Sequence, residues 1–308
     1  MGIKSLIKKV PLVRALAVVG QQCFFSCLTM ISPELNTRAR YYQAKHKRLN
    51  LKKPSTLSEK LLWLKLRKYI NDPLVCKCAD KYQVREYIKE CGFEDILVKL
   101  HGVYHRTEDI DWDSLPNAFV LKWNFGAGFN VICPNKSELK RQETVKQLRK
   151  WGKTKYWLTH SEMQYKEIPK VIICEEFLAD ETERVIPDYK VYCFHGKPQA
   201  IFVMHDRGAE IKSEFYDCQW NRLKNSGKYK EPDKPTKRPL TLSRMLEAAE
   251  TLSAPFPFVR CDFYEVNGKL YFGEMTFTPA GGLYTSETEI NGRSMADLIH
   301  IEQQEASK

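Results

Sequence analysis

Apolar residues in this chain gather into short runs that turn-forming residues separate. Runs of β-branched and aromatic residues predict strands at 96–98, 119–123, 131–133 and 171–178, and a hairpin over 189–204 that turns at 195–198. Apolar residues at helical spacing predict helices that begin at residues 57 and 80, and further helices at 136–152 and 242–252. Helices therefore alternate with antiparallel hairpins, without a sustained strand–helix–strand rhythm. We expect an α+β fold.

The first two predicted helices have recognisable ends. Thr56 is followed three residues later by Glu59, which is the capping-box spacing at a helix start. The second helix is expected to begin at Asp80 and to end near Gly92. Between residues 221 and 239 the chain is polar and rich in Lys and Pro, which predicts a loop.

Two carboxylates stand twelve residues apart in apolar, aromatic runs near the C-terminal end. Asp262 belongs to the first run, Glu274 to the second, and Asn267-Gly268 between them is a strong hairpin-turn signal. Antiparallel pairing would bring both carboxylates onto neighbouring strands that face one cleft. Mg²⁺ prefers such oxygen ligands and completes its octahedron with water and phosphates. The alternative is a pair of surface acids on a hairpin.

A glycine-rich loop joins the predicted strands at 119–123 and 131–133. Lys122 precedes it and Gly126 and Gly128 lie within it. Glycines let backbone N–H groups approach phosphate oxygens, and a lysine adds a compact positive charge. The loop lacks the Gly-Lys-Ser/Thr end of a P-loop, and Val131 replaces the third glycine of a dinucleotide fingerprint. It is either a lid over a nucleotide or an ordinary hairpin loop.

Further polar residues follow the strand at 171–178 and the next hairpin. Glu175-Glu176-Phe177-Leu178 offers a carboxylate and backbone groups that suit an adenine, or it is an exposed acidic strand end. Asp188-Tyr189-Lys190 and His205-Asp206-Arg207 place alternate polar residues on paired strands. We expect those residues to face one side together.

Composition describes a globular protein rather than a disordered one. The 308 residues are 43% hydrophobic and include 15 Phe, 15 Tyr and 6 Trp, without a repeat or low-complexity tract. The ten cysteines are scattered and form no Cys-x-x-Cys pair. We therefore expect free thiols in a reducing cytosol rather than disulfides or zinc.

The net charge of +11 is concentrated in the N-terminal 53 residues, which hold eleven Lys or Arg against Glu34 and so carry +10. Residues 15–31 are uncharged but interrupted by Gly20-Gln21-Gln22, which favours a helix at a membrane surface over a transmembrane span. A signal-peptide cleavage site is not evident. We expect a cytoplasmic protein with peripheral contact at the inner membrane face and no nucleic-acid partner. A polyanion clamp or a plain packing helix are the alternatives.

The order of these motifs resembles the ATP-grasp fold, and the chain resembles the TupA-like ATP-grasp family of teichuronopeptide and capsular polysaccharide biosynthesis. The resemblance covers roughly residues 55–295, through segments 80–88, 109–116, 119–130, 188–198, 215–220 and 258–279. It implies two α+β lobes that clasp ATP after a helical N-terminal region. The expected divisions are a basic arm at 1–53, a helical lobe at 54–115, a small lobe with the lid at 116–178 and a large lobe with the metal site at 179–308.

The resemblance also implies roles for individual residues. Lys122 would hold the α- and β-phosphates under the lid of Gly126 and Gly128. Glu175, Glu176, Phe177 and Leu178 would grip adenine, Asp188 would lie near the ribose, and Lys190 and Arg207 would steady the γ-phosphate and the acyl phosphate. Asp262 and Glu274 would bind Mg²⁺. Lys81 matches a position that often contacts ATP. Thr276 departs from the family pattern, which has Asn there, and this leaves a second metal ion open.

The implied reaction is ligation of a carboxylate to an amine through an acyl phosphate, at the expense of ATP. The family's setting implies a uronic-acid-type carboxylate of a surface glycan, with an amino acid or amine as the other substrate. A rival is a glycosyltransferase, because Asp109-Ile110-Asp111 and Asp111-Trp112-Asp113 each spell an Asp-x-Asp metal motif. A catalytically inactive binding module is a third possibility.

Overall fold

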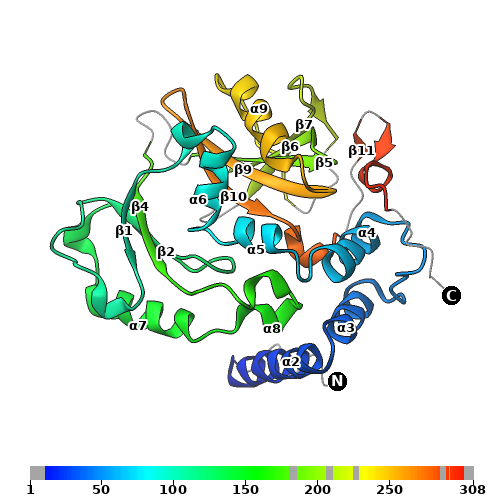
Figure 1. The fold of residues 1–308 in the computed structure, drawn as a ribbon, viewed down its shortest axis with the longest axis horizontal. Coiled ribbons are helices and arrows are strands. Elements are labelled where there is room, and N and C mark those ends of the chain that lie inside the picture. Colours follow the sequence, from blue (N-terminus) through cyan, green and yellow to red (C-terminus); the bar gives the residue numbers. More distant parts are fainter. Residues whose placement is uncertain are drawn as a thin grey trace.

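Two antiparallel sheets form the body of the molecule, the smaller to the left and the larger at the upper right of Figure 1. The computed structural model describes residues 11–179, 186–205, 211–224, 229–284, 289–290 and 292–301, the side chains of 11–16 excepted. The smaller sheet has the strand order β1-β4-β2-β3, and the larger has the order β10-β9-β5-β6-β7-β8. The pairings between these strands are antiparallel, so the expected α+β class is confirmed.

The strands have the following bounds. The smaller sheet consists of β1 (Leu100–Tyr104), β2 (Phe119–Trp123), β3 (Asn130–Cys133) and β4 (Ile172–Glu176). The larger sheet consists of β5 (Asp188–Phe194), β6 (Lys197–His205), β7 (Lys212–Tyr216), β8 (Arg222–Leu223), β9 (Phe258–Val266) and β10 (Lys269–Thr276). A separate pair is formed by β11 (Glu289–Ile290) and β12 (Arg293–Ser294).

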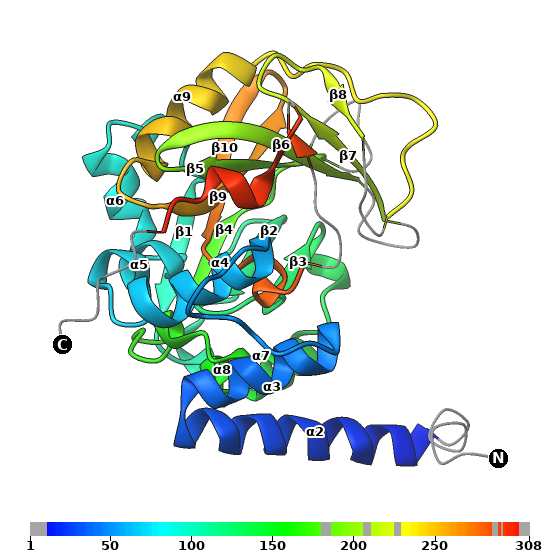
Figure 2. The ribbon, with the colours of Figure 1, turned by 90° about the vertical axis from the view of Figure 1, so that its right-hand side faces the viewer.

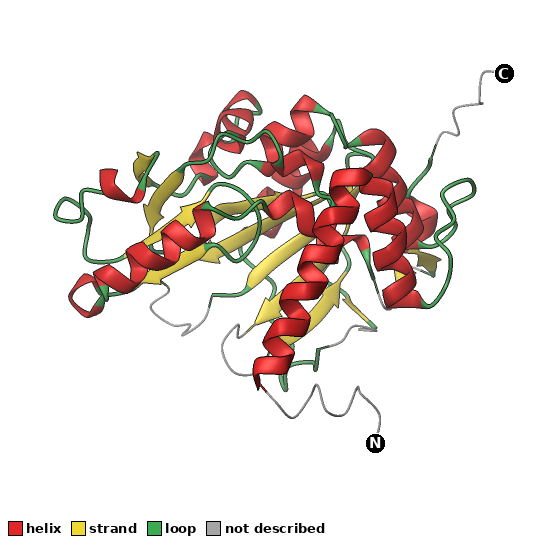
Figure 3. Ribbon diagram, turned by 90° about the horizontal axis from the view of Figure 1, so that it is seen from below, coloured by secondary structure: helices red, strands yellow, loops and turns green. Residues whose placement is uncertain are grey.

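Helices surround the sheets. They are α2 (Pro11–Ile31), α3 (Pro33–Lys45), α4 (Leu57–Trp63), the π-helix η1 (Leu64–Lys68), α5 (Pro73–Ala79), α6 (Val84–Glu90), α7 (Arg141–Gly152), α8 (Tyr156–His160) and α9 (Leu242–Ser253). Short 3₁₀ turns are η2 (Glu94–Ile96), η3 (Thr107–Asp109), η4 (Lys136–Glu138), η5 (Met163–Tyr165), η6 (Pro279–Gly282) and η7 (Met295–Leu298). Seen from below, helices lie in front of most of the strands (Figure 3).

Each sheet has its own apolar core. Helix α9 packs against β5, β6 and β9, and together with α4, α5 and α6 it encloses the main cluster of buried residues. Helix α7 packs against β2 over a second cluster in the smaller sheet. The ten cysteines are free, and five of them are buried in these cores. No helix among the described residues combines the length and apolar character that a membrane crossing requires.

Helices α2 and α3 pack on the outside of α8, and they lie along the lower edge of the molecule in Figure 2. Ser32 caps the start of α3 and stands between the two helices, so the pair forms a helical hairpin. In α3, Asn36 and Thr37 are buried. The described part of the basic arm is therefore packed into the fold, and a domain boundary after residue 53 stays a prediction.

Most of the predicted elements are present. The Thr56–Glu59 capping box begins α4, and β2, β3, β4, the β5–β6 hairpin, α9 and the β9–β10 hairpin lie where the pattern placed them. The strand predicted at 171–178 ends earlier, at Glu176, and the helix predicted from 136 begins at Arg141 after the turn η4. The predicted loop at 221–239 contains the short strand β8.

Two local predictions need correction. The helix predicted from Asp80 is present as α6 but begins at Val84, because the Asp80 carboxylate accepts hydrogen bonds from the N–H groups of Tyr82 and Gln83 and forms a turn before the helix. Residues 96–98 do not form a strand: Ile96 ends the turn η2, which packs against α6, Val98 is buried, and the first sheet pairing comes at Leu100. In both places local polar or packing contacts override the apolar pattern.

Candidate active site

A β-bulge sets the relation between the two predicted metal carboxylates. Asn267 and Gly268 both have positive φ (51° and 70°), which fits the two-residue hairpin turn that their sequence predicts. That turn pairs Val266 with Lys269 and, further along, Phe263 with Phe272. Uninterrupted pairing would place Gly273 opposite Asp262 and turn the side chain of Glu274 to the other face of the sheet. The register instead shifts between Phe272 and Glu274, so Glu274 stands opposite Asp262.

Only glycine fits at the bulge without rearrangement. A Cβ atom at Gly273 would lie 3.0 Å from the carbonyl oxygen of Asp262 and 3.0 Å from a ring carbon of Tyr264. The backbone of β10 can therefore approach β9 closely only because this side chain is absent. The predicted juxtaposition of the carboxylates is confirmed, although the hairpin turn alone does not produce it.

Asp262 is 2% exposed and is held by two cations. Arg260 donates from Nε to Oδ1 and from Nη2 to Oδ2, each at 2.7 Å, and Lys190 donates to Oδ2 at 2.6 Å. Lys190 stands opposite Asp262 on β5 and also donates to Asp188 Oδ2 at 2.6 Å. Burial alone would raise the pKa of Asp262, but Arg260 and Lys190 outweigh it and lower the pKa below its usual value. Asp262 is therefore an ionised carboxylate at neutral pH.

Glu274 and Thr276 continue this polar row along β10. Glu274 Oε1 accepts a hydrogen bond from the Thr276 hydroxyl at 3.2 Å, and its Oε2 lies 3.7 Å from Lys81 Nζ. Arg260 donates to Thr276 Oγ1 at 3.1 Å. Thr276 thus links Arg260 to Glu274, and it stands beside the predicted metal carboxylates.

Lys81 joins the helical region to the glycine-rich loop. It lies in the turn between α5 and α6, where its backbone N–H donates to Asn124 O at 2.9 Å and its ammonium donates to Gly126 O. Gly126 and Gly128 have positive φ (68° and 77°), and a Cβ at Gly126 would lie 2.7 Å from the ring of Tyr156. The loop therefore needs glycine at position 126 both for its backbone conformation and for the packing of Tyr156.

Lys122 faces the cavity because its neighbours face the core. Phe119, Leu121 and Trp123 of β2 are buried in the second apolar cluster, and strand alternation puts Lys122 on the opposite face. Its ammonium donates to Glu175 Oε2 at 2.6 Å, and Glu175 Oε1 accepts from Arg85 Nη1 at 3.2 Å.

The acidic end of β4 is divided between two environments. The Glu175 carboxylate, predicted to grip adenine, is engaged with Lys122 and Arg85. Glu176 is exposed and its N–H donates to Lys99 O at 2.9 Å, while Phe177 and Leu178 lie beyond the end of β4. An adenine contact by residues 175–178 stays a prediction.

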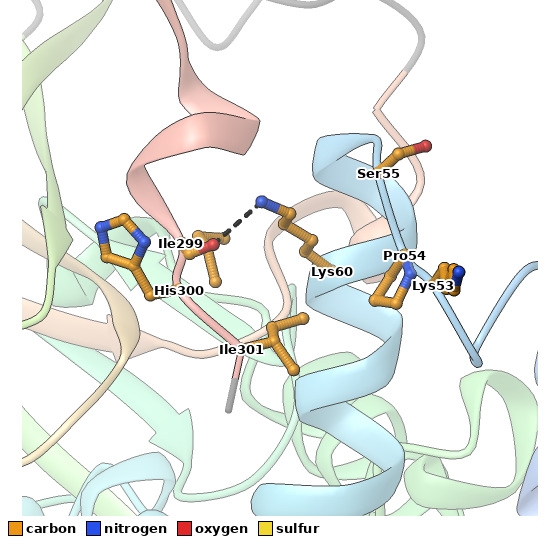
Figure 4. A pocket seen from close by; sticks show the side chains of 7 residues that line it. All are labelled: Lys53, Pro54, Ser55, Lys60, Ile299, His300 and Ile301. Atoms are coloured by element: carbon orange, nitrogen blue, oxygen red, sulfur yellow. Dashed lines mark hydrogen bonds between the residues drawn. The ribbon is translucent and has the colours of Figure 1, made fainter. Parts of the chain in front are cut away.

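One cavity of about 200 Å³ brings six of the predicted residues together. Its lining includes Lys81, Lys122, Gly128, Asp188, Asp262 and Glu274. Lys190 and Thr276 do not line it but bind residues that do. Arg207 lies outside the described residues. A larger cavity of about 410 Å³ lies between α4 and residues 299–301, and no residue predicted for nucleotide or metal lines it (Figure 4).

Two arginines of the site were not assigned a role from the sequence. Arg260 lies two residues before Asp262 on β9, and strand alternation places residues two apart on the same face of the sheet. The sequence could therefore have predicted that Arg260 lies beside Asp262. Arg85 contacts Glu175 ninety residues away, and no local pattern in the sequence indicates that contact. Both arginines place fixed positive charge against a carboxylate of the site.

The residues present fit a magnesium ion. Two carboxylates face each other across β9 and β10, with a hydroxyl beside them, and Mg²⁺ typically takes one or two protein carboxylates together with phosphate oxygens. Within the described ranges no group of three or more His, Cys, Asp or Glu side chains could hold a metal ion. The carboxylates that line the cavity are Asp188, Asp262 and Glu274. In the structure these carboxylates are paired with the protein's own cations Arg260, Lys190 and Lys81.

The Asp-x-Asp triplets have structural partners of their own. Asp109 belongs to η3 and pairs with Arg106 at 3.0 Å. Asp111 accepts hydrogen bonds from the N–H groups of Asp113 and Ser114. These aspartates order a loop, and they do not line the cavity of Lys122 and Asp262.

Two antiparallel lobes, a glycine loop with its lysine and a strand pair with opposed carboxylates define an ATP-grasp protein. The chain belongs to the TupA-like ATPgrasp family, whose model matches residues 59–299. No curated protein is similar enough in sequence to be matched.

Solved ATP-grasp structures are distantly similar. A D-alanine–D-alanine ligase from Bacillus anthracis is 15% identical with a TM-score of 0.40, over 66% of this chain and 59% of that chain. The ADP complex of the N5-carboxyaminoimidazole ribonucleotide synthetase purK is 12% identical with a TM-score of 0.44, over 75% and 51% of the two chains. An L-amino acid ligase from Bacillus licheniformis is 15% identical with a TM-score of 0.39, over 66% and 41%. The family assignment does not rest on them.

Proposed function

We propose that the protein is an ATP-dependent ligase that joins a carboxylate to an amine through an acyl phosphate. The observation that carries the proposal is the pairing of Asp262 with Glu274 in a cavity that Lys81 and Lys122 also line. Lysines suit the phosphates of a nucleotide, and paired carboxylates suit the divalent cation that accompanies them. Membership of an ATP-grasp family supports the same assignment.

In the proposed reaction a substrate carboxylate oxygen attacks the γ-phosphorus of ATP, and ADP leaves. An amine then attacks the acyl carbon, phosphate leaves and the nitrogen loses a proton. Lys81 and Lys122 bind nucleotide phosphates, and Lys190 with Arg207 neutralises the charge that spreads over the transferring group. The loop of Gly126 and Gly128 excludes water from the acyl phosphate.

Mg²⁺ held by Asp262 and Glu274 would polarise phosphoryl oxygens and offset their charge. Arg260 fixes the Asp262 carboxylate in orientation and keeps it ionised. Thr276 adds a hydroxyl at the position where the family pattern has Asn, and its bond to Glu274 orients that carboxylate. We assign one metal ion to Asp262 and Glu274. Thr276 lies beside that ion in this proposal and is not assigned as one of its ligands.

For substrates, we propose a uronic-acid-type carboxylate of a surface or capsular glycan and an amino acid or amine. The support is the setting of the TupA-like family and the excess of positive charge in residues 1–53, which suits an anionic acceptor.

We further propose that α2 and α3 hold the protein at the cytoplasmic face of a membrane. Ten large apolar side chains are exposed among the described residues, and seven of them lie on these two helices: Val18, Val19, Phe24, Met30, Ile31, Leu35 and Tyr42. The same N-terminal segment carries a net charge of +10. Exposed apolar side chains on helices with basic surroundings suit an anionic bilayer surface.

One assay tests the proposed activity. Purified protein is incubated with ATP, Mg²⁺, a mixture of amino acids and a uronic acid, and nucleotides and amide products are measured. Formation of ADP and phosphate together with an amide is expected. Release of UDP from sugar nucleotides without ADP formation would favour the glycosyltransferase instead and overturn the proposal.

A further inference from the structure

A buried carboxylate outside the cavity lies where three parts of the molecule meet. Glu162, just after α8, is 7% exposed, and its Oε1 accepts a hydrogen bond from the Thr278 hydroxyl at 2.6 Å. Thr278 itself is 4% exposed and follows Glu274 by four residues and Thr276 by two. Glu162 is therefore bound to the chain where it leaves β10, the strand of the proposed metal carboxylate.

The other neighbours of Glu162 come from the N-terminal helices. Lys65 of η1 is 4% exposed and Arg40 belongs to α3, and both cations act on the carboxylate. Burial raises the pKa of Glu162, while Thr278, Lys65 and Arg40 oppose that shift. A buried carboxylate is costly to move, because displacement would break its hydrogen bond to Thr278 in a poorly solvated place.

Helix α8 is fixed at its end by the same helices. Thr29 of α2 donates to Leu158 O at 2.6 Å, Arg40 donates to Thr159 O at 2.6 Å, and Lys65 donates to His160 O at 2.9 Å. These donors satisfy C-terminal carbonyls that a helix cannot satisfy internally. The end of α8 that leads to Glu162 is thereby held in place.

The opposite end of α8 contacts the glycine-rich loop. Tyr156 packs against Gly126, and its ring centroid is 5.6 Å from that of Phe129. The short segment 156–162 therefore touches the loop with its first residue and the exit of β10 with its last. Helix α8 and the turn that follows it therefore connect the two sides of the cavity.

The residues on either side of Thr278 are also held in place, so they could not easily adjust if the Glu162–Thr278 hydrogen bond were lost. Phe277 is 2% exposed and packs edge-on against Tyr69, with ring centroids 5.4 Å apart. Ala280 and Gly281 then follow with φ of 53° and 64° in η6, where Gly281 lies against the ring of His160. The direction in which β10 ends is thus determined by contacts with Glu162 and its neighbours.

We propose that Glu162 is a positioning residue for the metal carboxylate: through Thr278 it fixes the end of β10 that carries Glu274 and Thr276, and through α8 it keeps that end in register with the glycine-rich loop. The inference rests on the proposed function, because it assigns Glu274 to a metal–nucleotide site. Glu162 itself lines no part of that cavity. Its effect is expected on metal-dependent nucleotide affinity rather than on stability alone.

The test compares the affinity for ADP with and without Mg²⁺, measured by calorimetry on the full chain. In the wild type, Mg²⁺ should strengthen ADP binding. In Glu162→Gln and in Thr278→Val that Mg²⁺-dependent gain should fall by about tenfold, which is the size typical of losing a group that orients a metal ligand. Thr278→Val removes the hydrogen bond and leaves the Glu162 carboxylate unchanged, so it serves where Glu162→Gln folds poorly.

Glu59→Gln is the matched control. Glu59 is 6% exposed and accepts hydrogen bonds from the backbone N–H groups of Asn50, Ser55 and Thr56, none of which belongs to β10. Its loss should lower the melting temperature without changing the ratio of the two affinities.

The outcomes separate the two proposals. An Mg²⁺-dependent gain in Glu162→Gln and Thr278→Val equal to that of Glu59→Gln would overturn the positioning role and leave the ligase proposal standing. A wild type that binds ADP no more tightly with Mg²⁺ than without it would overturn both.

Discussion

At the residue scale, two carboxylates of the site are each held by two cations. Asp262 has Arg260 and Lys190 within hydrogen-bonding distance, and Glu175 has Lys122 and Arg85. Burial without Arg260 and Lys190 would raise the pKa of Asp262. Lys190 and Lys122, which the proposed reaction needs, are thus held by Asp262 and Glu175 in the structure.

His160 provides a prediction at this scale. Its Nδ1 is buried and has no hydrogen-bond partner within the described part of the chain. Burial, together with Arg40 and Lys65, lowers the pKa of His160 to about 4. Between that value and the ordinary histidine pKa the unfolded chain binds a proton that the folded protein does not, so stability falls as the pH is lowered from about 6.5 to about 4.

We expect His160→Gln to reduce this loss of unfolding free energy by roughly 1–3 kcal/mol across that pH range. Urea unfolding at several pH values measures it, and His105→Gln at an exposed position is the matched control. Equal pH dependence in the wild type and His160→Gln would show that His160 is not buried in its neutral form.

At the scale of the elements, the sequence predicts the turn of the β9–β10 hairpin but not the bulge within it. Asn267-Gly268 predicts the turn because both positions need positive φ. The same turn puts Asp262 and Glu274 out of register by one residue, and the bulge at Gly273 corrects this. A glycine inside a strand run does not reveal by itself whether a bulge forms there, because that depends on how closely β9 approaches.

Gly273→Ala tests the role of the bulge. The added Cβ would meet the Asp262 carbonyl and the Tyr264 ring at 3.0 Å, so we expect β10 to shift and the Glu274 carboxylate to move away from Asp262. Mg²⁺-dependent ADP formation should fall by about tenfold or more, as for the loss of an oriented metal ligand. Gly20→Ala is the control, because its Cβ would meet no atom within 4 Å. Full activity in Gly273→Ala would mean that the register of Glu274 is unimportant.

Contacts between residues far apart in the chain could not be predicted from the sequence, for a different reason. Lys122 and the glycine loop are adjacent in the chain, so their association is a local pattern. Arg85 with Glu175, and Glu162 with Thr278, are pairs separated by 90 and 116 residues. Such pairs follow from how the lobes pack, and neither residue carries a local signal of its partner.

At the scale of the whole molecule, the described residues form two lobes, and the N-terminal helices α2 and α3 pack against α8. Helices α2 and α3 bind α8 with their inner side chains, such as Thr29 and Arg40, and leave apolar side chains on the outside. Removing residues 1–53 would uncover that interface. Surface substitutions are therefore the cleaner test of membrane contact.

We expect the wild type to bind vesicles that contain phosphatidylglycerol, and to bind phosphatidylcholine vesicles less tightly, with an affinity that falls as salt rises. Phe24→Ser, Met30→Ser and Ile31→Ser together should weaken binding by about tenfold or more, because apolar area is lost from the docking face. Ile132→Ser with Leu240→Ser is the control, since those residues are 59% and 86% exposed elsewhere on the surface. Cosedimentation measures the bound fraction.

Equal vesicle binding by the α2 triple variant and the control would contradict this docking surface. Concentration-dependent dimerisation that the triple variant abolishes, with no vesicle binding by the wild type, would show that a second copy of the chain covers the helices instead.

The most direct test of the account is Mg²⁺-dependent ADP formation by the wild type, Lys122→Ala and Asp262→Asn, with melting temperatures measured in parallel. The account predicts that the wild type forms ADP only with Mg²⁺, and that each variant loses activity by about a hundredfold or more while remaining folded, because phosphate and metal binding are removed separately. Unchanged ADP formation in both folded variants would contradict it.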